Sequence, residues 1–449
     1  MRSTLPTFNE VWQRQFRTRV LKQMQCFPPE STLLIGCSGG MDSMLLLHVL
    51  SALYPQKIRA IYIDHQLQDS SAVWGAFVSA QCAARGIDCV IKKVDVQSGN
   101  LEQQAREARY QAYLKHRQAH EILVLAHHQQ DQAETLILRL LSGAGVAGLS
   151  AMKILDVRGQ LSIWRPLLDV SREQICQWAT QLKVEHIEDP SNLDTHYDRA
   201  WCRRELWPLL QSRYAKMQQA FARTSYLMQD ADDILQQVLA QDLSACGSDG
   251  VLDLQVFAQL SAARQRQLLS AWMKGQDSYR PHFEMVQRLF NEVIHAKIDA
   301  QAALHWNQYY YVRYQQQLFR LSAAEYLAEK NQSAATVVHL QLSLNQKINL
   351  LSGSYQVASA QIGLSRCLLG KVLNVTQRQG GEKIHLYARV GAWPLKKALQ
   401  EAQIFPWQRY TIQILSIDNV MLGVFTPKGF WLAQSDYCEV GGWQPNLSS

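Results

Sequence analysis

The feature that most constrains this chain is the run Ser38-Gly39-Gly40-Met41-Asp42-Ser43, which stands between two apolar segments. The segment before it, Thr32–Cys37, is apolar throughout and predicts a buried strand of a parallel sheet. The segment after it, residues 44–50, suits the buried face of a helix. A glycine-rich turn between a strand and a helix brings backbone N–H groups and the positive end of the helix dipole together. The run therefore predicts a phosphate-binding loop.

The loop differs from the common P-loop, because no lysine lies between Thr32 and Tyr54. Asp42 repels phosphate unless a metal ion bridges the two, so the run favours a Mg²⁺-bound triphosphate that is cleaved to pyrophosphate. The alternative is an ordinary Ser/Gly turn in which Asp42 stabilises a helix start.

The six residues resemble the signature of the PP-loop ATP pyrophosphatases, a family of AMP-forming synthetases and tRNA-modifying enzymes. The resemblance implies ATP and Mg²⁺ as cofactors, with Asp42 as a Mg²⁺ ligand. It also implies a set of nucleotide-binding residues, which are Ser38, Gly39, Gly40, Met41, Asp42, Ser43 and Asp64.

Strand and helix patterns alternate from Thr32 to about Leu141. The strands are expected at Thr32–Cys37, Ile58–Asp64, Cys89–Val94 and Glu121–Ala126, with helices that include Ser70–Arg85 and Leu101–Ala119. This order predicts an α/β fold with a Rossmann-like, doubly wound parallel sheet. Ligands of such sheets bind beyond the carboxyl ends of the strands. Ser38, Asp64 and His127 each follow such an end.

Outside residues 32–141, the sequence no longer alternates between strand and helix patterns. A leading helix is expected within Phe8–Gln25, helical periodicity dominates Lys216 to about Ala296, and Ser322–Ala335 reads as a linker to a second β-rich unit. We therefore predict a PP-loop catalytic domain (1–215), a mainly helical tRNA/substrate-binding domain (216–330) and a small β-rich α+β tRNA-binding domain (336–449).

The cysteine spacing and the lengths of the apolar stretches indicate the cellular compartment of the protein. The nine cysteines include no C-x-x-C pair, which gives no zinc-ribbon or iron–sulfur pattern and is typical of reduced thiols in a cytoplasmic protein. Neither a secretory apolar region nor an apolar stretch of about 18 residues occurs, so secretion and membrane insertion are not expected.

A second motif follows the fourth strand, where residues 126–135 read A-H-H-Q-Q-D-Q-A-E-T. His127 and Asp131 are four positions apart and would share one face of a helix. A histidine and a carboxylate at a strand end can hold a metal–phosphate group or move a proton. The alternative is helix capping with a core histidine, and the neighbouring loop makes the functional interpretation the better one.

This second motif and several others resemble the tRNA(Ile)-lysidine synthetase family within the PP-loop group. The ordered set spans Thr32 to roughly Phe430, and its further members are 63–65, 105–110, 138–149, 165–168, 189–192, 197–199, 378–382, 395–397 and 406–407. Three motifs depart from the family pattern at four positions: Gln130 stands for an acid, Gln66 and Gln68 for a glycine and an arginine, and Ala200 for an asparagine.

The resemblance implies an AMP-forming ligase that joins the ε-amine of free lysine to the 2-carbon of the wobble cytidine in the CAU anticodon of an isoleucine tRNA. An adenylated tRNA is the intermediate, and lysidine, AMP and pyrophosphate are the products. The implied catalytic residues are Asp42, His127, Asp131, Arg199 and Arg203. Asp131 would orient or deprotonate lysine, and His127 would contact the adenylate, although these two roles could be exchanged.

In the C-terminal unit, basic residues interleave with aromatic ones, which suits phosphate contacts and base stacking. The expected tRNA-binding residues are Arg378, Lys383, Lys396 and Lys397. The competing functions are another PP-loop tRNA modification, such as cytidine thiolation, and tRNA binding without catalysis. The oligomeric state stays open, with a homodimer among the alternatives.

Overall fold

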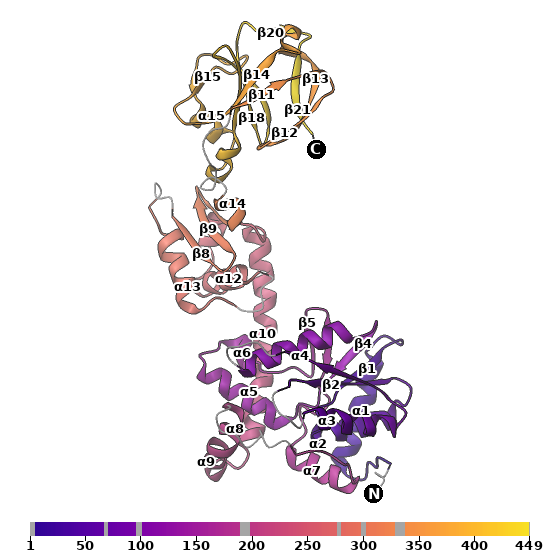
Figure 1. The fold of residues 1–449 in the computed structure, drawn as a ribbon. Helices are drawn as coiled ribbons and strands as arrows, with labels where there is room; N and C mark the ends of the chain where they lie inside the picture. The colour runs from indigo at the N-terminus through magenta and orange to yellow at the C-terminus, as the bar shows by residue number, and fades with distance from the viewer. Residues whose placement is uncertain are drawn as a thin grey trace. The chain divides into compact units, whose positions relative to one another are not determined.

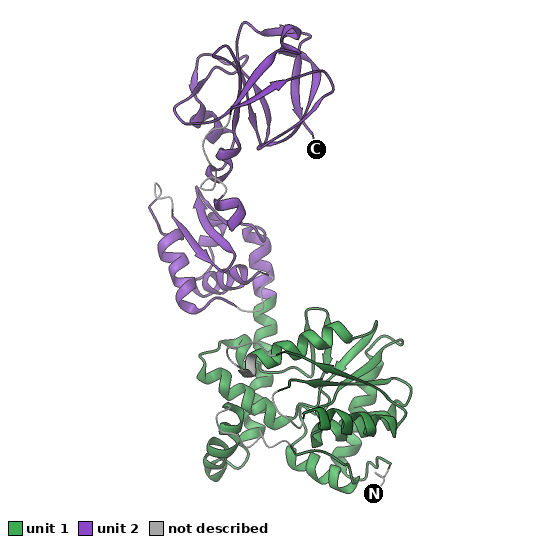
Figure 2. Ribbon diagram, in the orientation of Figure 1, with its two compact units in different colours: residues 1–236 green, residues 237–449 purple. Residues whose placement is uncertain are grey.

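The computed structural model describes residues 5–66, 71–95, 101–188, 198–275, 280–297, 302–327 and 337–448. The chain forms two compact units, residues 1–236 and 237–449 (Figures 1 and 2). The division into three domains at about residues 215 and 330 stays a prediction. Within the described residues, no helix is both long enough and apolar enough to cross a membrane.

A six-stranded sheet forms the centre of the first unit (Figure 1). Its strands are β1 (Thr32–Gly36), β2 (Ile58–Asp64), β3 (Asp88–Lys93), β4 (Glu121–Val124), β5 (Leu155–Arg158) and β6 (Leu161–Trp164). Their order is β3-β2-β1-β4-β6-β5, and every neighbouring pair is parallel except β5 with β6. The predicted α/β class and its four strands are confirmed, whereas the short β5–β6 hairpin had not been predicted.

Both faces of this sheet are covered, because alternate side chains of a strand point to opposite faces. Leu33 and Ile35 pack in one core with Trp178, while Leu34 packs in the other with Tyr113. The first core is built with helices α1 (Val11–Gln25), α2 (Met41–Leu53), α3 (Ser71–Ala83) and α7 (Arg172–Gln181). The second core is closed by α4 (Leu101–His116). The sheet is therefore doubly wound.

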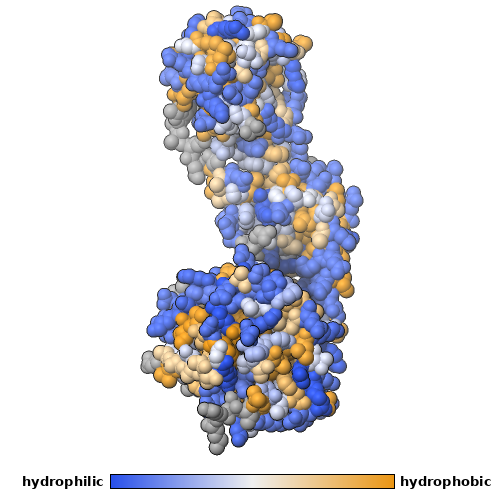
Figure 3. Space-filling view, turned by 90° about the vertical axis from the view of Figure 1, so that its right-hand side faces the viewer, coloured by the Kyte–Doolittle hydropathy of each residue, from blue (hydrophilic) through white to orange (hydrophobic). Residues whose placement is uncertain are grey.

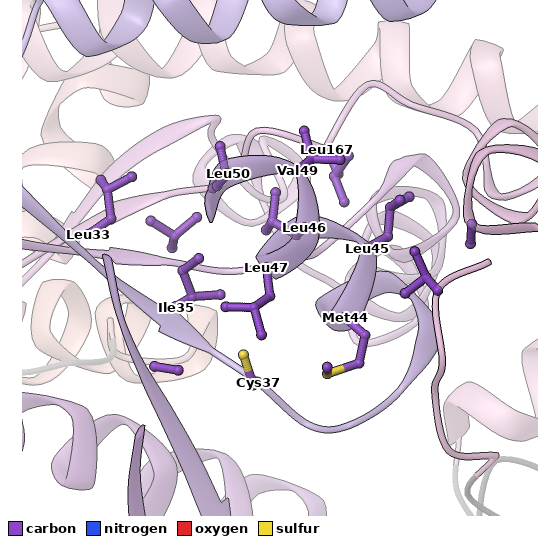
Figure 4. Packing of buried hydrophobic residues seen from close by; sticks show 14 of the residues in the cluster. Leu33, Ile35, Cys37, Met44, Leu45, Leu46, Leu47, Val49, Leu50 and Leu167 are labelled. Atoms are coloured by element: carbon purple, nitrogen blue, oxygen red, sulfur yellow. The ribbon is translucent and has the colours of Figure 1, made fainter. Parts of the chain in front are cut away.

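Helix α2 is the most deeply buried of these elements. Its side chains from Ser43 to Leu50 are all buried (Figure 4). A helix that is apolar on all sides belongs in a core, and each such side chain contributes about 1.5–3 kcal/mol on burial. The start of α2, which carries Asp42, is fixed by this packing.

The rest of the first unit is helical, apart from the sheet just described. These helices are α5 (Gln129–Leu141), α6 (Val146–Leu149), α8 (Asp198–Trp201), the π-helix η2 (Cys202–Leu206), α9 (Trp207–Arg213) and α10 (Met217–Cys246), which continues into the second unit.

The second unit begins with helices around a four-stranded sheet of order β7-β10-β9-β8. Its elements are β7 (Val251–Asp253), α11 (Leu254–Ala258), α12 (Ala262–Lys274), α13 (Phe283–Arg288), η3 (Leu289–Ile294), β8 (Ala303–Trp306), β9 (Tyr309–Tyr314), β10 (Gln317–Ser322) and α14 (Ala323–Leu327). The predicted mainly helical middle region is confirmed. Helix α14 lies in the expected linker, of which residues 328–335 fall outside the described residues.

The C-terminal part is β-rich, as predicted. One sheet contains β11 (Val338–Gln341), β14 (Val372–Gln377), β17 (Gln413–Ile417), β18 (Val420–Thr426) and β19 (Gly429–Leu432). A second sheet contains β12 (Lys347–Leu350), β13 (Gly353–Leu364), β20 (Cys438–Val440) and β21 (Trp443–Leu447). Smaller elements are η4 (Arg366–Leu368), β15 (Lys383–Ile384), β16 (Trp393–Pro394), α15 (Leu395–Glu401) and η5 (Pro406–Thr411).

Gln66 stands where the family pattern has a glycine, and its backbone conformation is one that glycine adopts more easily. Its φ is +54°, a left-handed conformation, and its backbone N–H donates to the Asp64 carboxylate over 2.9 Å. Side chains other than glycine are strained there by about 1–2 kcal/mol. The turn at the end of β2 therefore keeps the backbone that glycine would favour, although the residue is glutamine.

We expect Gln66→Gly to change the unfolding free energy by less than about 1 kcal/mol, because relief of strain offsets the extra chain entropy of glycine. Gln66→Val should lower stability by about 1–2 kcal/mol, since a β-branched side chain tolerates this φ poorly. Urea unfolding of both variants measures the difference. A valine variant as stable as the parent would contradict a strained turn.

Candidate active site

The loop predicted to bind phosphate connects β1 to α2 and is held by its two serines. Ser43 Oγ accepts from the Ser38 N–H at 3.2 Å and donates to the Gly40 carbonyl at 2.9 Å. The Gly40 N–H donates to Ser38 Oγ at 3.3 Å. These bonds fold the backbone into a tight turn.

Gly39 has a φ of +87°, and a Cβ at this position would lie 3.2 Å from the Ile187 side chain. Ile187 also donates its N–H to the Gly39 carbonyl at 2.9 Å. Gly40 is the N-cap residue of α2, and it supplies no side-chain hydrogen bond to the helix. The turn therefore leaves the N-terminus of α2 to interact with an anion.

Asp42 lies in the first turn of α2, where its two carboxylate oxygens differ. Oδ2 accepts from Arg172 at 3.3 Å, whereas Oδ1 is buried without a hydrogen-bond partner. An unpartnered carboxylate oxygen beside an anion site suits a hard divalent cation. In the described part of the chain, no three His, Cys, Asp or Glu side chains are arranged for a metal. Mg²⁺ needs only one or two carboxylates when phosphates and waters complete its shell, so the residues fit a nucleotide-bound ion.

One prediction about the second motif is wrong. Helix α5 begins at Gln129 with His128 as its extended N-cap (φ −127°, ψ −176°), so His127 precedes the helix and shares no face with Asp131. The reason is the capping: His128 Nδ1 accepts from the Gln130 N–H, and Asp131 accepts from the His128 N–H at 3.0 Å. Together these bonds start the helix one residue after His128.

His128 connects the two motifs. Its Nδ1 accepts a backbone hydrogen bond, so Nε2 faces the other groups of the site, with Arg172 Nη1 at 3.3 Å. Nε2 lies 3.5 Å from Asp131 Oδ2 and 3.8 Å from Asp42 Oδ2. The imidazole therefore lies between the carboxylates of the two motifs.

Two carboxylates of α5 share one arginine. Arg203, on η2, donates from Nε and Nη2 to the two oxygens of Glu134 at 2.6 and 2.9 Å, and from Nη2 to Asp131 at 3.3 Å. Glu134 is fully buried and also accepts from the Gln130 side chain at 3.0 Å. Glu134 therefore supplies a second acid near the position where Gln130 lacks one.

The charges around these groups shift their pKa values. Burial opposes ionisation of Asp131, but the charges of His128, His127 and Arg199 and a backbone N–H lower its pKa to about 2. Burial also lowers the pKa of His127 to about 3. The charge of Asp131 opposes this shift, whereas the charges of Arg165, Arg199 and Arg106 add to it. Near neutral pH, the site thus contains a carboxylate beside a neutral imidazole.

A cavity of about 290 Å³ extends from the loop past the ends of β1, β2 and β4. Ser38, Asp42, Ser43 and His127 line it, together with His65 and Arg109. Tyr62, Trp74, Tyr113 and Leu125 add aromatic and apolar lining, which suits contact with a flat base.

Some predicted residues point elsewhere. The Asp64 side chain is buried and caps the Gln66 turn, and Met41 packs against the hydrophobic core. Their nucleotide contacts stay predictions. Arg199 acts on His127 and Asp131 through its charge. Part of the adjoining motif, residues 189–197, lies outside the described residues.

Sequence reasoning assigned no role to three residues of this site: His128, which it noted only as following the fourth strand, Glu134 and Arg172. A signal for Glu134 existed, because it stands three positions after Asp131 on the same helix face. No local pattern identifies Arg172, which is 130 positions from Asp42 along the chain.

Cys37 also lines the cavity, and burial raises the pKa of its thiol far above the usual range. A thiol held protonated is a poor nucleophile. This cysteine is therefore a packing residue rather than a sulfur carrier.

In the second unit, the predicted RNA-binding cations differ in accessibility. Lys383, Lys396 and Lys397 are exposed, whereas Arg378 forms an ion pair with Glu382 at 3.4 Å. Lys397 lies over the Trp393 ring, 5.3 Å from its centroid. The lysines are free to meet phosphates, and Arg378 is engaged within the fold.

Three family models match the chain. Residues 12–210 match a PP-loop domain, residues 252–319 the TilS substrate binding domain, and residues 373–438 the TilS substrate C-terminal domain. These matches fall in the order in which the sequence motifs occur.

Curated relatives match over most of their length. The tRNA(Ile)-lysidine synthase of Acinetobacter baylyi is 60% identical over 449 residues, covering 100% of this chain and 98% of that protein. The proteins of the same name from Actinobacillus pleuropneumoniae and Serratia proteamaculans are 34% and 33% identical, covering 85% and 88% of this chain and 93% of each relative.

The pKa of His127 gives a test of the site's electrostatics. An unfolded histidine binds its proton below about pH 6.5, whereas folded His127 does so only near pH 3. Between these values the unfolded chain binds more protons, so this contribution to stability is complete above about pH 6.5 and is lost as pH falls. In His127→Gln, the fall in unfolding free energy from pH 6.5 to 4 should be shallower by up to about 1.4 kcal/mol per pH unit. Urea unfolding across this range measures it, and parallel curves would contradict the shift.

Proposed function

The chain belongs to the tRNA(Ile)-lysidine synthase family, and on that premise we propose how its residues carry out ATP-dependent lysidine formation. The reaction joins the ε-amine of free lysine to the 2-carbon of the wobble cytidine in the CAU anticodon of an isoleucine tRNA. The observation that carries the proposal is the convergence of Asp42, on the PP-loop, with Asp131, on the second motif, around the His128 ring.

The chemistry requires two steps at one place. The O2 atom of cytidine attacks the α-phosphorus of ATP, and pyrophosphate leaves. The lysine amine then attacks C2, and AMP leaves with the former O2 atom. A site for this reaction must stabilise phosphate charge in the first step and position a cationic amino acid for the second.

We assign the first step to the β1–α2 loop. Ser38, Gly39, Gly40 and Ser43 would surround the pyrophosphate group with backbone and hydroxyl donors at the start of α2. Asp42 would hold Mg²⁺ through its unpartnered Oδ1. The ion would supply positive charge against the phosphate oxygens.

We assign lysine binding to the Asp131 and Glu134 pair. A carboxylate with a pKa of about 2 stays ionised and attracts an ammonium group, but it is a weak general base. Of the two roles considered for Asp131, orientation of lysine is therefore the better supported. Arg203 and Arg199 neutralise the acids while the amine is absent, and a guanidinium suits phosphate as well.

The second unit would hold the body of the tRNA through Lys383, Lys396 and Lys397. We place the enzyme in the cytoplasm, where tRNA and ATP are available.

Thiolation is disfavoured because Cys37, the cysteine in the cavity lining, is held protonated. A binding protein without catalysis would have no use for the unpartnered Asp42 oxygen. A measurement of mass in solution decides between a monomer and the homodimer.

Asp42→Asn should reduce tRNA-dependent pyrophosphate release by about 100-fold or more, because the substitution removes the charge that holds the metal. Stability should change by only about 1 kcal/mol, the scale of a charge in the first turn of a helix. Labelled ATP and thermal unfolding measure the two effects. Asp88→Asn, an exposed acid at the start of β3, is the control. Full activity in Asp42→Asn would overturn the assignment.

Asp131→Asn separates the two steps. Adenylated tRNA should still form, while kcat/KM for lysine falls by roughly 10²-fold, the scale of removing one partner of a buried charge pair. The shape of the pH–rate profile should not change if Asp131 orients lysine, whereas loss of a general base would remove one limb. Exposed Asp230→Asn is the control. Failure to form the adenylate would place Asp131 with the phosphates instead.

A further inference from the structure

A second cavity, of about 470 Å³, lies in the C-terminal part of the second unit, where α15 and β19 contribute lining residues. Leu386, Ala398 and Trp431 form apolar walls, and Tyr387 adds a second aromatic ring. These side chains are buried or half-buried. These aromatic and aliphatic side chains can contact the face of a flat ring.

The rim of this cavity is polar. Arg389 and Glu401 form an ion pair of 3.4 Å across it, with side chains 55% and 46% exposed. An ion pair this exposed contributes little to stability, so both groups can exchange partners with a ligand. A guanidinium and a carboxylate together offer hydrogen-bond donors and acceptors to the edge of a ring.

Arg389, a lining residue of the cavity, shares an aromatic ring with a second cation. Arg389 and Lys397 both lie over the Trp393 ring, at 5.7 and 5.3 Å from its centroid. Cations that face one ring are held by its π electrons while their outer sides stay hydrated. Lys396 stands next to Lys397 on the exposed side of α15. An anionic chain therefore meets two or three cations directly beside an aromatic cavity.

We propose that this cavity binds one unpaired nucleotide of the tRNA, with its base between the apolar walls and its phosphate on Arg389 and Lys397. The proposal rests on the proposed tRNA substrate. Single-stranded RNA is recognised by this combination of an aromatic surface for the base and cations for the backbone. An apolar peptide would gain nothing from the cations. Hydrophilic residues cover most of the face drawn in Figure 3, with smaller hydrophobic patches between them.

The test uses variants of the full-length protein in which a larger side chain fills the cavity. Ile362, on β13, lines it and is 38% exposed, whereas Val372, on β14, is 51% exposed and is not among the lining residues. Ile362→Trp should weaken binding of isoleucine tRNA about tenfold, the scale of losing one stacked base. Val372→Trp should have no effect. Ala402→Leu, which fills the cavity from the C-cap of α15, is the second variant should Ile362→Trp fail to fold.

The salt dependence of tRNA binding distinguishes contacts to the base from contacts to the phosphate. Ile362→Trp should leave the slope of log Kd against log salt unchanged, because it removes no charge. Arg389→Ala with Lys397→Ala should reduce the slope by up to about two. Equal tRNA affinity in the filled variants and Val372→Trp would overturn the cavity proposal.

Pyrophosphate release by the unmodified protein reports separately on the proposed function. Normal release together with unaffected binding in the filled variants would remove the cavity proposal alone. If the unmodified protein released no pyrophosphate but the filled variants bound RNA more weakly, the proposed function would be contradicted and the cavity proposal would be supported.

Discussion

The packing of α2 against β1 is the constraint on which the catalytic unit depends. The helix is buried along Ser43–Leu50 and the strand along its central residues, so the turn between them has one geometry. That geometry requires the positive φ of Gly39 and places Asp42 at the helix start. Hydrophobic burial of this size exceeds the strain of a tight turn and the cost of a half-buried carboxylate. The core thus holds in place a loop whose polar groups would otherwise favour other conformations.

The second constraint is electrostatic. Asp42, Asp131 and Glu134 bring three negative charges near a site that must accept a triphosphate. Arg172 and Arg203 contact these acids directly, and His128 lies between Asp42 and Asp131. Each acid has a cationic or N–H partner, and these partners offset part of the negative charge that a phosphate would meet. The low pKa of Asp131 has its own causes: the charges of His128, His127 and Arg199 and the His128 backbone N–H together outweigh the effect of burial.

The sequence predicted what depends on local pattern. Strand β2 matches its expected bounds, Ile58–Asp64, because the apolar run there is long and clear. It could not predict contacts across large separations, such as Arg172 with Asp42 or Arg203 with Glu134, since these depend on the folded chain. His127 was placed on a helix because propensity does not reveal that the His128 side chain caps α5. The departure at Gln66 was visible in the sequence, but its meaning required the φ of that residue.

In the proposed mechanism, the two chemical steps make opposite demands on one site, and we infer that the arginines meet both. Transfer of the adenylyl group develops negative charge, which donors and cations stabilise. Lysine capture needs ionised acids that an ammonium can approach. Arg203 satisfies both Asp131 and Glu134 through one planar guanidinium, so a single side-chain movement would uncover two carboxylates and deliver a cation to phosphate. Lysine at position 203 would retain the charge but lose this bidentate geometry, which is why an arginine at this place on η2 serves the sequence of steps.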